Sequence, residues 1–234
     1  MQAVILAGGK GSRLKPFTVS LPKPLVPIDD VPILEVVLKQ LKRAGFTDIV
    51  LAVNHLSNLI MAFFGDGKSL GLNITYSREE YPLGTAAPLR LVDQLDDNFL
   101  VMNGDLLTTI DYAKLMDFHR SEGCDITIAT YKKEVNIDLG VLKCDGKLFL
   151  DYIEKPTYSF DVSMGIYIFK KEILEYIPRD GKFDMPELVL AVRDAGKKIS
   201  CFSGEYYWLD IGRVADYETA NQLFKDRRSE FLPE

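Results

Sequence analysis

The residues best suited to chemistry lie in a glycine-rich segment, residues 8–23, directly after a short apolar run. Gly8, Gly9 and Gly11 come first, and Arg13 and Lys23 then add two positive charges. Glycines let backbone N–H groups approach a ligand because no Cβ stands in the way, and successive N–H groups in a tight turn form an anion site. The segment therefore predicts a loop that wraps a nucleoside triphosphate, with a solvated basic connector as the alternative.

Two common glycine motifs do not match this segment. A P-loop requires Gly-Lys-Ser/Thr, which this segment lacks, and a dinucleotide fingerprint requires a third glycine where Leu14 stands. A glycine-rich turn alone is a weak signal. Arg13 and the tripeptide at 22–24, Pro-Lys-Pro, make this one more specific because they place fixed cations around the turn.

Two aspartates also stand out because their neighbours are not polar. Asp105 lies between Gly104 and Leu106, and Asp210 lies in the segment 208–212, Trp-Leu-Asp-Ile-Gly. A carboxylate in apolar surroundings is stable only when it is paired or bound to a metal. Each aspartate taken alone is equally compatible with the cap of a turn.

Five blocks of sequence together resemble the signature of the sugar-1-phosphate nucleotidyltransferases, also called nucleotide-sugar pyrophosphorylases. They occur in the order of that family and span nearly the whole chain. The blocks are Leu-Ala-Gly-Gly-x-Gly-Ser-Arg-Leu at 6–14 with Pro-Lys-Pro-Leu at 22–25, Pro-Leu-Gly-Thr-Ala at 82–86, Asn-Gly-Asp at 103–105, Glu-Lys-Pro at 154–156 and Trp-Leu-Asp-Ile-Gly at 208–212.

The resemblance implies a reaction and a set of residues for it. A sugar 1-phosphate oxygen would attack the α-phosphorus of a nucleoside triphosphate and release pyrophosphate, with Mg²⁺ on Asp105 and Asp210. The implied catalytic residues are Arg13, Lys23, Asp105, Lys155 and Asp210. The implied nucleotide-binding residues are Leu6, Ala7, Gly8, Gly9, Gly11, Ser12, Arg13, Lys23, Pro82, Gly84, Thr85, Asn103 and Asp105. The implied sugar-phosphate residues are Gly104, Glu154, Lys155, Ser163 and Gly165, with Glu154 accepting hydrogen bonds from sugar hydroxyls.

The segment Leu-Gly-Thr-Ala is most frequent among guanylyl- and adenylyl-transferring members, so GTP is the expected nucleotide. The expected sugar is mannose 1-phosphate or a heptose 1-phosphate. Ala87 and Tyr81 depart from the commonest guanylyl pattern, and Ser163 replaces an asparagine that usually meets the sugar. Uridylyl, cytidylyl or adenylyl transfer, or a catalytically silent nucleotide-sugar sensor that regulates a partner enzyme, remain the alternatives.

Apolar runs alternate with helical stripes and predict the scaffold for these residues. Strands are expected at 48–53, 73–76, 99–102 and 125–130, and helices at 32–44, 56–64, 85–95 and 112–122. This alternation predicts an α/β fold with a Rossmann-like, doubly wound, mostly parallel sheet, whose ligand lies beyond the carboxyl ends of the strands. The resemblance implies the nucleotidyltransferase (GT-A-like) variant of this fold.

In the second half of the chain, the regular alternation of strands and helices gives way to short strands. Short strands at 140–143, 148–153 and 162–169 predict an inserted β-rich sugar-binding region over the crevice, followed by helical segments at 171–176 and 185–195, a strand at 198–203 and a closing helix at 215–228. We expect a single domain over 1–234, with a nucleotide-binding half at 1–130, a sugar-binding half at 131–212 and the closing helix within 213–234. The chain ends soon after this helix, so we expect no C-terminal β-helix or regulatory domain.

Composition restricts the partners. The 234 residues carry a net charge of −6, which argues against a nucleic-acid partner. No run is apolar enough for a membrane span and no signal peptide is seen, so we expect a cytoplasmic protein without a membrane partner. The three cysteines lack the spacing of a zinc site. A homodimer is possible, and the two histidines suit a reaction that requires no proton shuttle.

Overall fold

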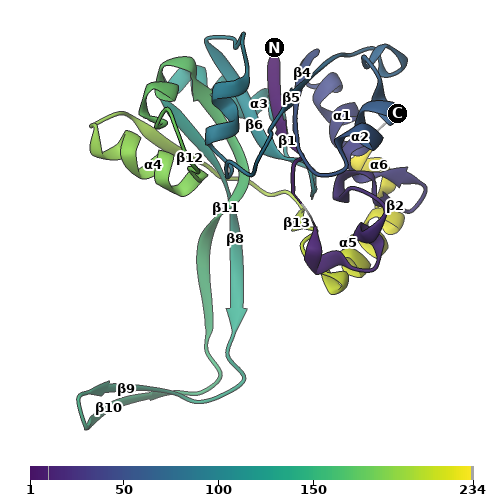
Figure 1. The fold of residues 1–234 in the computed structure, drawn as a ribbon. Coiled ribbons are helices and arrows are strands. Elements are labelled where there is room, and N and C mark those ends of the chain that lie inside the picture. Colours follow the sequence, from purple (N-terminus) through teal and green to yellow (C-terminus); the bar gives the residue numbers. More distant parts are fainter. Residues whose placement is uncertain (10, 233–234) are drawn as a thin grey trace.

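The structure is a computed structural model that describes residues 1–9 and 11–232. Its centre is a seven-stranded sheet in which every strand is parallel to the others except β11, which runs antiparallel between β6 and β8 (Figure 1). The strands in spatial order are β12 (Ile199–Phe202), β8 (Ile126–Asn136), β11 (Thr157–Lys170), β6 (Asn98–Asn103), β1 (Gln2–Leu6), β4 (Asp48–Val53) and β5 (Asn73–Arg78).

Helices cover both faces of this sheet because successive side chains of a strand point to opposite faces. In β1, Ala3 and Ile5 enter one core and Val4 enters the other. The first core contains α1 (Ile33–Arg43), α2 (Ser57–Phe64) and α3 (Tyr112–Glu122). The second contains the 3-10 helices η5 (Ala87–Leu91) and η6 (Lys171–Tyr176) and helix α4 (Met185–Asp194). The predicted α/β fold with a mostly parallel sheet is confirmed.

A third, smaller core joins the two ends of the chain. Helix α5 (Val214–Asp226) contributes Phe224, and α6 (Arg228–Phe231) contributes Phe231, to a cluster with Leu14 of the glycine-rich segment. This packing fixes the glycine-rich segment against the closing helix. The remaining short elements of the fold are η1 (Ser12–Leu14), η2 (Phe17–Val19), η3 (Lys23–Leu25), β2 (Pro27–Ile28), β3 (Val31–Pro32), η4 (Lys68–Leu70), β7 (Leu106–Thr108) and β13 (Trp208–Asp210).

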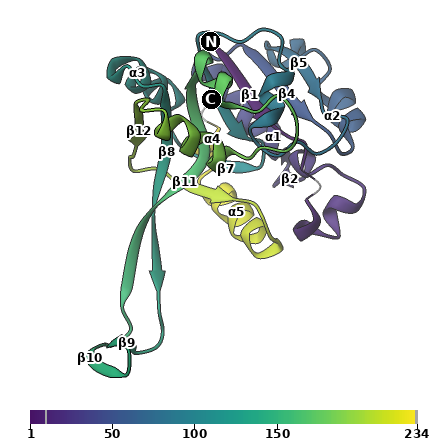
Figure 2. The ribbon, with the colours of Figure 1, turned by 60° about the vertical axis from the view of Figure 1, so that its left-hand side comes forward.

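Strands β8 and β11 continue beyond the sheet as a two-stranded ladder that leaves the body of the molecule. At its end lies a separate hairpin of β9 (Val141–Asp145) and β10 (Leu148–Ile153). We call residues 132–161 the arm. Figures 1 and 2, which differ by a rotation of 60°, both show the arm projecting away from the helices and the sheet.

Three expectations from the sequence differ from the structure. The segment 85–95 forms only the 3-10 helix η5, and the N–H groups of Ala86 and Ala87 before it bond to the Phe183 carbonyl. The segment 171–176 is likewise a 3-10 helix. The β-rich insertion forms as strands, yet it extends outward as the arm instead of covering the crevice.

His119 on α3 is buried and bridges two elements. Its Nε2 lies 3.0 Å from Oδ1 of Asn98, and its Nδ1 lies 2.8 Å from the hydroxyl of Thr127. The neutral ring satisfies both partners by donating to Asn98 and accepting from Thr127. Burial, with a further contribution from the charge of Lys170, lowers the pKa of His119 to about 4.

This pKa predicts a loss of stability in acid. A histidine whose folded pKa lies below its unfolded value stabilises the fold at neutral pH and loses that effect as pH falls from the unfolded pKa toward the folded one. The free energy of unfolding should therefore fall by about 2 kcal/mol between about pH 7.5 and about pH 5 through His119. Denaturant unfolding should show this difference in wild type and in His55→Gln, and a smaller difference in His119→Gln. An unchanged pH dependence in His119→Gln would contradict the assignment.

None of the helices in the described residues is long and apolar enough to cross a membrane.

Candidate active site

The carboxyl ends of strands β1, β4, β5 and β6 form one edge of the sheet, where a cavity of about 410 Å³ opens. Parallel strands present their ligand at this edge. The residues that line the cavity are Leu6, Gly8, Gly9, Ala52, Asn54, Glu79, Pro82, Gly84, Thr85, Asn103, Asp105 and Lys182. Many of the predicted nucleotide-binding residues therefore lie together. The volume of the cavity they line is typical of a pocket for a small ligand.

The glycine-rich loop is shaped by contacts that exclude side chains. Gly11 has a φ of +58°, and a Cβ on it would lie 2.9 Å from Cγ2 of Thr18. Thr18 also donates its hydroxyl to the Gly11 carbonyl over 2.7 Å, which fixes the turn. Ala7 is buried and donates its N–H to Ala52, while Ser12 is exposed in η1. The loop thus begins on the sheet and ends beside solvent.

A second turn, residues 83–87, closes the cavity on its far side. Gly84 has a φ of +92°, and a Cβ on it would lie 2.6 Å from Oδ1 of Asp184. The same oxygen accepts the N–H of Thr85 over 3.0 Å. Lys182 forms an ion pair of 2.8 Å with Asp184. The loop before α4 therefore holds in place the turn that carries Gly84 and Thr85, two of the predicted nucleotide-binding residues.

Lys23 and Asp105 form an ion pair at the junction between the cavity and the glycine-rich loop. Lys23 is only 8% exposed, and its Cβ lies against Gly11 of the glycine-rich loop. Asp105 follows β6 directly. A buried cation fixed in this way carries its charge at one position, which suits a phosphate that must be held in a defined place.

Asp210 reaches the same place from the far end of the chain. Strand β13 pairs antiparallel with β7 and sets Asp210 opposite Leu106, and Ile211 donates its N–H to the Asp105 carbonyl over 3.2 Å. Partial burial raises the pKa of the Asp210 carboxyl above its usual value, and the negative charge of Asp105 raises it further. The charges of Lys23 and Arg13 act in the opposite direction.

Arg13 and Asp216 complete the group around Gly212. A Cβ on Gly212 would lie 3.6 Å from each of three atoms: Nη2 of Arg13, Oδ2 of Asp210 and Oδ2 of Asp216. Arg13 is exposed, so its guanidinium is free to meet an incoming anion. The structure therefore brings Arg13, Lys23, Asp105 and Asp210, four of the predicted catalytic residues, to one edge of the sheet.

The two aspartates suit Mg²⁺ only as a shared pair. No group of three or more histidine, cysteine or acidic side chains arranged for a metal occurs among the described residues. Mg²⁺ is usually held by one or two carboxylates, with substrate phosphates completing its coordination. After burial, the negative charge of Asp105 is the next contribution that raises the pKa of Asp210, and a cation between the two carboxylates would relieve this repulsion. The donor set therefore fits an ion that binds together with a phosphate substrate.

The predicted sugar-phosphate residues fall into two groups. Gly165 lies against the nucleotide cavity: its φ is +73°, and a Cβ on it would lie 2.6 Å from Nδ2 of Asn103. Gly104 is packed against Ile5. Ser163 is exposed and its hydroxyl lies 2.9 Å from the Tyr167 hydroxyl, at the base of the arm.

Glu154 and Lys155 form the other group and lie on the arm. They are exposed in the connection between β10 and β11, beyond the last ladder pair of Asn136 with Thr157. The structure does not place them beside Asp105 and Asp210. Their assignment to the sugar phosphate stays a prediction.

Several residues at this edge were not among those predicted from the sequence. Asn54 directly follows the predicted strand 48–53, a signal that could have found it. Glu79 directly follows β5, but β5 extends two residues beyond the predicted strand 73–76, so the same signal was not visible there. Lys182 and Asp216 lack such a signal, because only the packing of α4 and α5 brings them here.

The chain was compared with known proteins. A family model described as "Nucleotidyl transferase" matches residues 2–227. The chain is 35% identical, over 93% of its length, to a UTP–glucose-1-phosphate uridylyltransferase of Synechocystis sp., and spans 61% of that relative. It is 33% identical to a mannose-1-phosphate guanylyltransferase of Mycobacterium tuberculosis, again over 93% of the chain, and spans 62% of that relative. It is 36% identical to a mannose-1-phosphate guanyltransferase of Schizosaccharomyces pombe, of which it spans 67% with the whole chain aligned.

Two solved structures share the fold. A putative glucose-1-phosphate thymidylyltransferase of Bacillus anthracis superposes with a TM-score of 0.77 at 23% identity, over 97% of this chain and 96% of that one. The protein HddC of Yersinia pseudotuberculosis, complexed with GMP-PN, superposes with a TM-score of 0.72 at 26% identity, over 95% of this chain and 99% of that one. From the family match and these relatives, the chain belongs to the nucleotidyl transferase family.

Proposed function

We propose that this protein transfers a nucleotidyl group from a nucleoside triphosphate to a sugar 1-phosphate and releases pyrophosphate. One observation carries the proposal: a cavity of small-ligand size continues, through Asp105, into a group that holds the cations Lys23 and Arg13 and the carboxylate of Asp210. A phosphate monoester has a second pKa of about 6, so it is largely dianionic at neutral pH and needs no general base. The protein has only to position two anions and neutralise their charge.

The residues divide this work between them. Lys23 is fixed beside Asp105 and would hold the phosphates next to the cavity, while the exposed guanidinium of Arg13 would grip the outer phosphates. Asp105 and Asp210 would hold Mg²⁺. When bound, that ion supplies positive charge between the α-phosphate and the incoming sugar phosphate.

We further propose that the nucleotide is GTP. Glu79 is half-buried at the cavity: its Oε2 accepts the N–H of Leu83 over 2.9 Å, and its Oε1 lies beside Gly8. Burial raises the pKa of the Glu79 carboxyl. An ionised carboxylate only accepts hydrogen bonds, and guanine presents two donors, N1–H and the 2-amino group, on one edge. Lys182, which lines the same cavity, could donate to the guanine carbonyl.

The relatives support this choice without deciding it, since the Synechocystis relative is a uridylyltransferase and the M. tuberculosis and S. pombe relatives transfer guanylyl groups. Mannose 1-phosphate or a heptose 1-phosphate remains the proposed acceptor. The test is pyrophosphate release over a grid of nucleoside triphosphates and sugar 1-phosphates, in which GTP should give the highest kcat/KM. Fastest turnover with UTP or dTTP would remove the guanylyl assignment and keep the reaction class. No release from any pair would reject the reaction.

Substitution of Glu79 tests the base assignment directly. Glu79→Gln replaces one acceptor with a donor, so kcat/KM for GTP should fall by roughly 10- to 100-fold, the scale of one hydrogen bond to a charged group. The KM for the sugar phosphate should change little, because the sugar phosphate approaches from the side of Asp210. Glu80→Gln is the matched control, since Glu80 is exposed and outside the cavity. If the two substitutions lowered kcat/KM for GTP equally, Glu79 would have no specific role in recognition of the base.

A further inference from the structure

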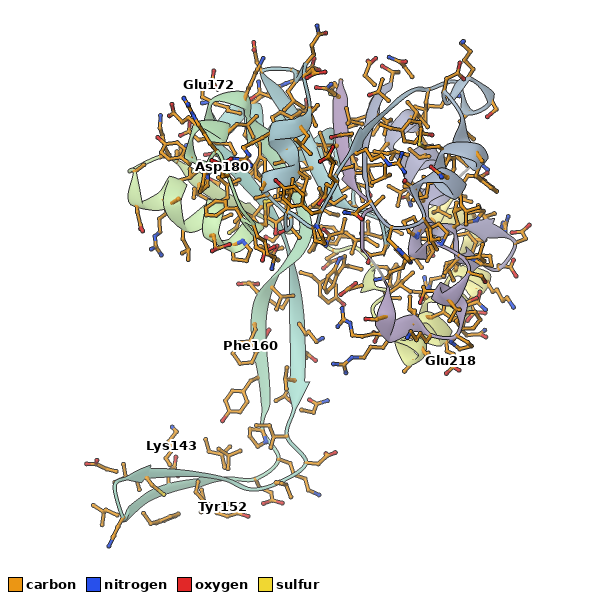
Figure 3. All side chains as sticks on the ribbon, viewed as in Figure 1. Lys143, Tyr152, Phe160, Glu172, Asp180 and Glu218 are labelled. Carbon is orange, nitrogen blue, oxygen red and sulfur yellow. The ribbon has the colours of Figure 1, made fainter. Side chains whose placement is uncertain are left out.

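The arm carries apolar side chains that none of the described residues covers. Leu139 is 72% exposed at one bend and Leu148 is 64% exposed at the tip. Figure 3 shows Phe160 along the ladder and Tyr152 on the hairpin, both far from the body. Exposed apolar side chains of the arm are Val135, Leu139, Leu142, Leu148, Phe149, Leu150, Tyr152 and Phe160. A run of this kind marks an interaction surface, because isolated monomers rarely expose one.

An uncovered hairpin of this size is also a weak structure. A two-stranded hairpin is at best marginally stable in water, and independent stability requires a third strand or a packed face. The arm has no third strand, and its tip pair of β9 and β10 forms a sheet of its own. Its order therefore depends on a surface supplied from outside the arm.

The base of the arm lies beside the proposed active site. Gly165, two residues after Ser163, lies against Asn103 of the nucleotide cavity. From Ser163 the ladder with β8 is continuous out to Thr157, which pairs with Asn136. Six residues of strand span about 20 Å, and Lys155 lies two residues further on.

This geometry keeps Lys155 away from the site in its own chain. A rigid ladder that starts beside the site and pivots there keeps its far end about 20 Å away at every angle. Return of Lys155 to Asp105 in the same chain would require the ladder pairs from Lys132 to Asn136 to break. A second copy has no such restriction, because its arm approaches from outside.

We propose that two copies of this chain exchange arms, so that the arm of each lies over the Asp105–Asp210 group of the other and supplies Glu154 and Lys155 to its sugar phosphate. The surface that receives the partner's arm is the open cavity of about 870 Å³ lined by Arg13, Asp210, Gly212, Arg213 and Asp216, with Trp208 and Leu209 as apolar walls. Tyr131 and the first residues of the chain's own arm, Lys132, Lys133 and Glu134, line its remaining side. Exchange about a two-fold axis covers both arms at once. The roles given to Glu154 and Lys155 rest on the proposed function.

Lys155 has a backbone conformation that fits this role. Its φ is +43°, in the left-handed region that a side-chain-bearing residue rarely adopts, and Pro156 follows it. Strained residues of this kind persist where the surroundings hold them and gather at ligand sites. An arm seated on a second subunit would provide those surroundings.

Complementation between two inactive variants tests the exchange. Lys155→Met damages only the arm and Asp210→Asn damages only the carboxylate group. The two chains are coexpressed with different tags and purified over both, so that each dimer holds one of each. With exchange, the intact arm of the Asp210→Asn chain serves the intact carboxylates of the Lys155→Met chain, and about half of the wild-type activity per dimer should return. A mixed dimer as inactive as the single variants would overturn the proposal, because each site would then use its own arm.

A physical measurement separates the exchange from the proposed reaction. Sedimentation should give a dimer for wild type and for the control Lys147→Ala, and a monomer for Leu148→Asp combined with Phe149→Asp. These residues are exposed at the tip, so the body of the chain should remain folded. A monomeric wild type overturns the exchange, and so does full activity of Lys155→Met. An inactive wild type that still sediments as an arm-dependent dimer rejects the proposed function and keeps the contact between the arms and a second copy.

Discussion

Asp105→Asn and Asp210→Asn should each lower kcat for nucleotidyl transfer by at least roughly 10²- to 10³-fold, the scale of losing one charged contact to the transition state. The two carboxylates meet through the pairing of β13 with β7, and either alone leaves Mg²⁺ poorly held. They should therefore act as a unit, and the double variant should be hardly worse than either single one. Steady-state pyrophosphate release measures all three.

Both variants should stay folded, because asparagine is nearly isosteric with aspartate. Asp210→Asn removes a carboxyl whose pKa is raised by burial and by the charge of Asp105. Asp105→Asn leaves the buried Lys23 without its ionic partner, so its free energy of unfolding should be lower than that of wild type. Asp117→Asn, on the exposed face of α3, is the matched control and should keep full activity. Wild-type activity should vanish with excess chelator and return with Mg²⁺. Losses that simply multiply in the double variant would show that the aspartates act independently and would reject the shared ion.

Arg13→Ala should lower turnover by roughly 10²-fold or more, because it removes a charged contact to the triphosphate. The side chain is exposed, so the free energy of unfolding should change by no more than about 0.5 kcal/mol. Lys15→Ala, two residues further along the same loop and also exposed, is the matched control and should remain active. Near-normal activity of a folded Arg13→Ala variant would assign Arg13 to the solvated surface of the loop.

Lys23→Met should lower turnover as much as Arg13→Ala does, and it should also lower the stability of the fold. Lys23 is buried against Asp105, and removal of the cation leaves a partly buried carboxylate without its partner. The expected signature is a loss of activity together with a lower unfolding midpoint. Addition of Mg²⁺ should recover part of the stability in Lys23→Met, because the ion can neutralise Asp105 in place of the lysine.

Local signals in the sequence were enough to locate most of the scaffold. Strand β4 was predicted with the bounds Asp48–Val53 and helix α3 with the bounds Tyr112–Glu122. Each depends on side-chain patterns within a few residues, since an apolar run or a helical stripe is defined over one element. The glycine-rich loop was found for the same reason, because its glycines and cations lie within one short segment.

The same local patterns were wrong where the course of the chain depends on distant segments. Residues 85–95 carry a helical pattern, yet their first N–H groups bond to Phe183, almost a hundred residues away, and only a 3-10 turn forms. The insertion has the predicted strands β9 and β10, yet nothing in its sequence tells whether they fold over the crevice or extend from it. That depends on how far the β8–β11 ladder continues.

By itself, the sequence determined the fold class and the identity of the chemical groups, because apolar periodicity and the glycine-rich motif are properties of neighbouring residues. Only the tertiary structure decided which of those groups meet. Asp105 and Asp210 are 105 residues apart in the chain and come together because strands β7 and β13 pair at three residue positions. Glu79, Lys182 and Asp216 join the site because the ends of β5, α4 and α5 converge on one sheet edge, and Glu154 and Lys155 leave it because their ladder extends outward. Such contacts depend on the packing of whole elements, which no local pattern of residues encodes.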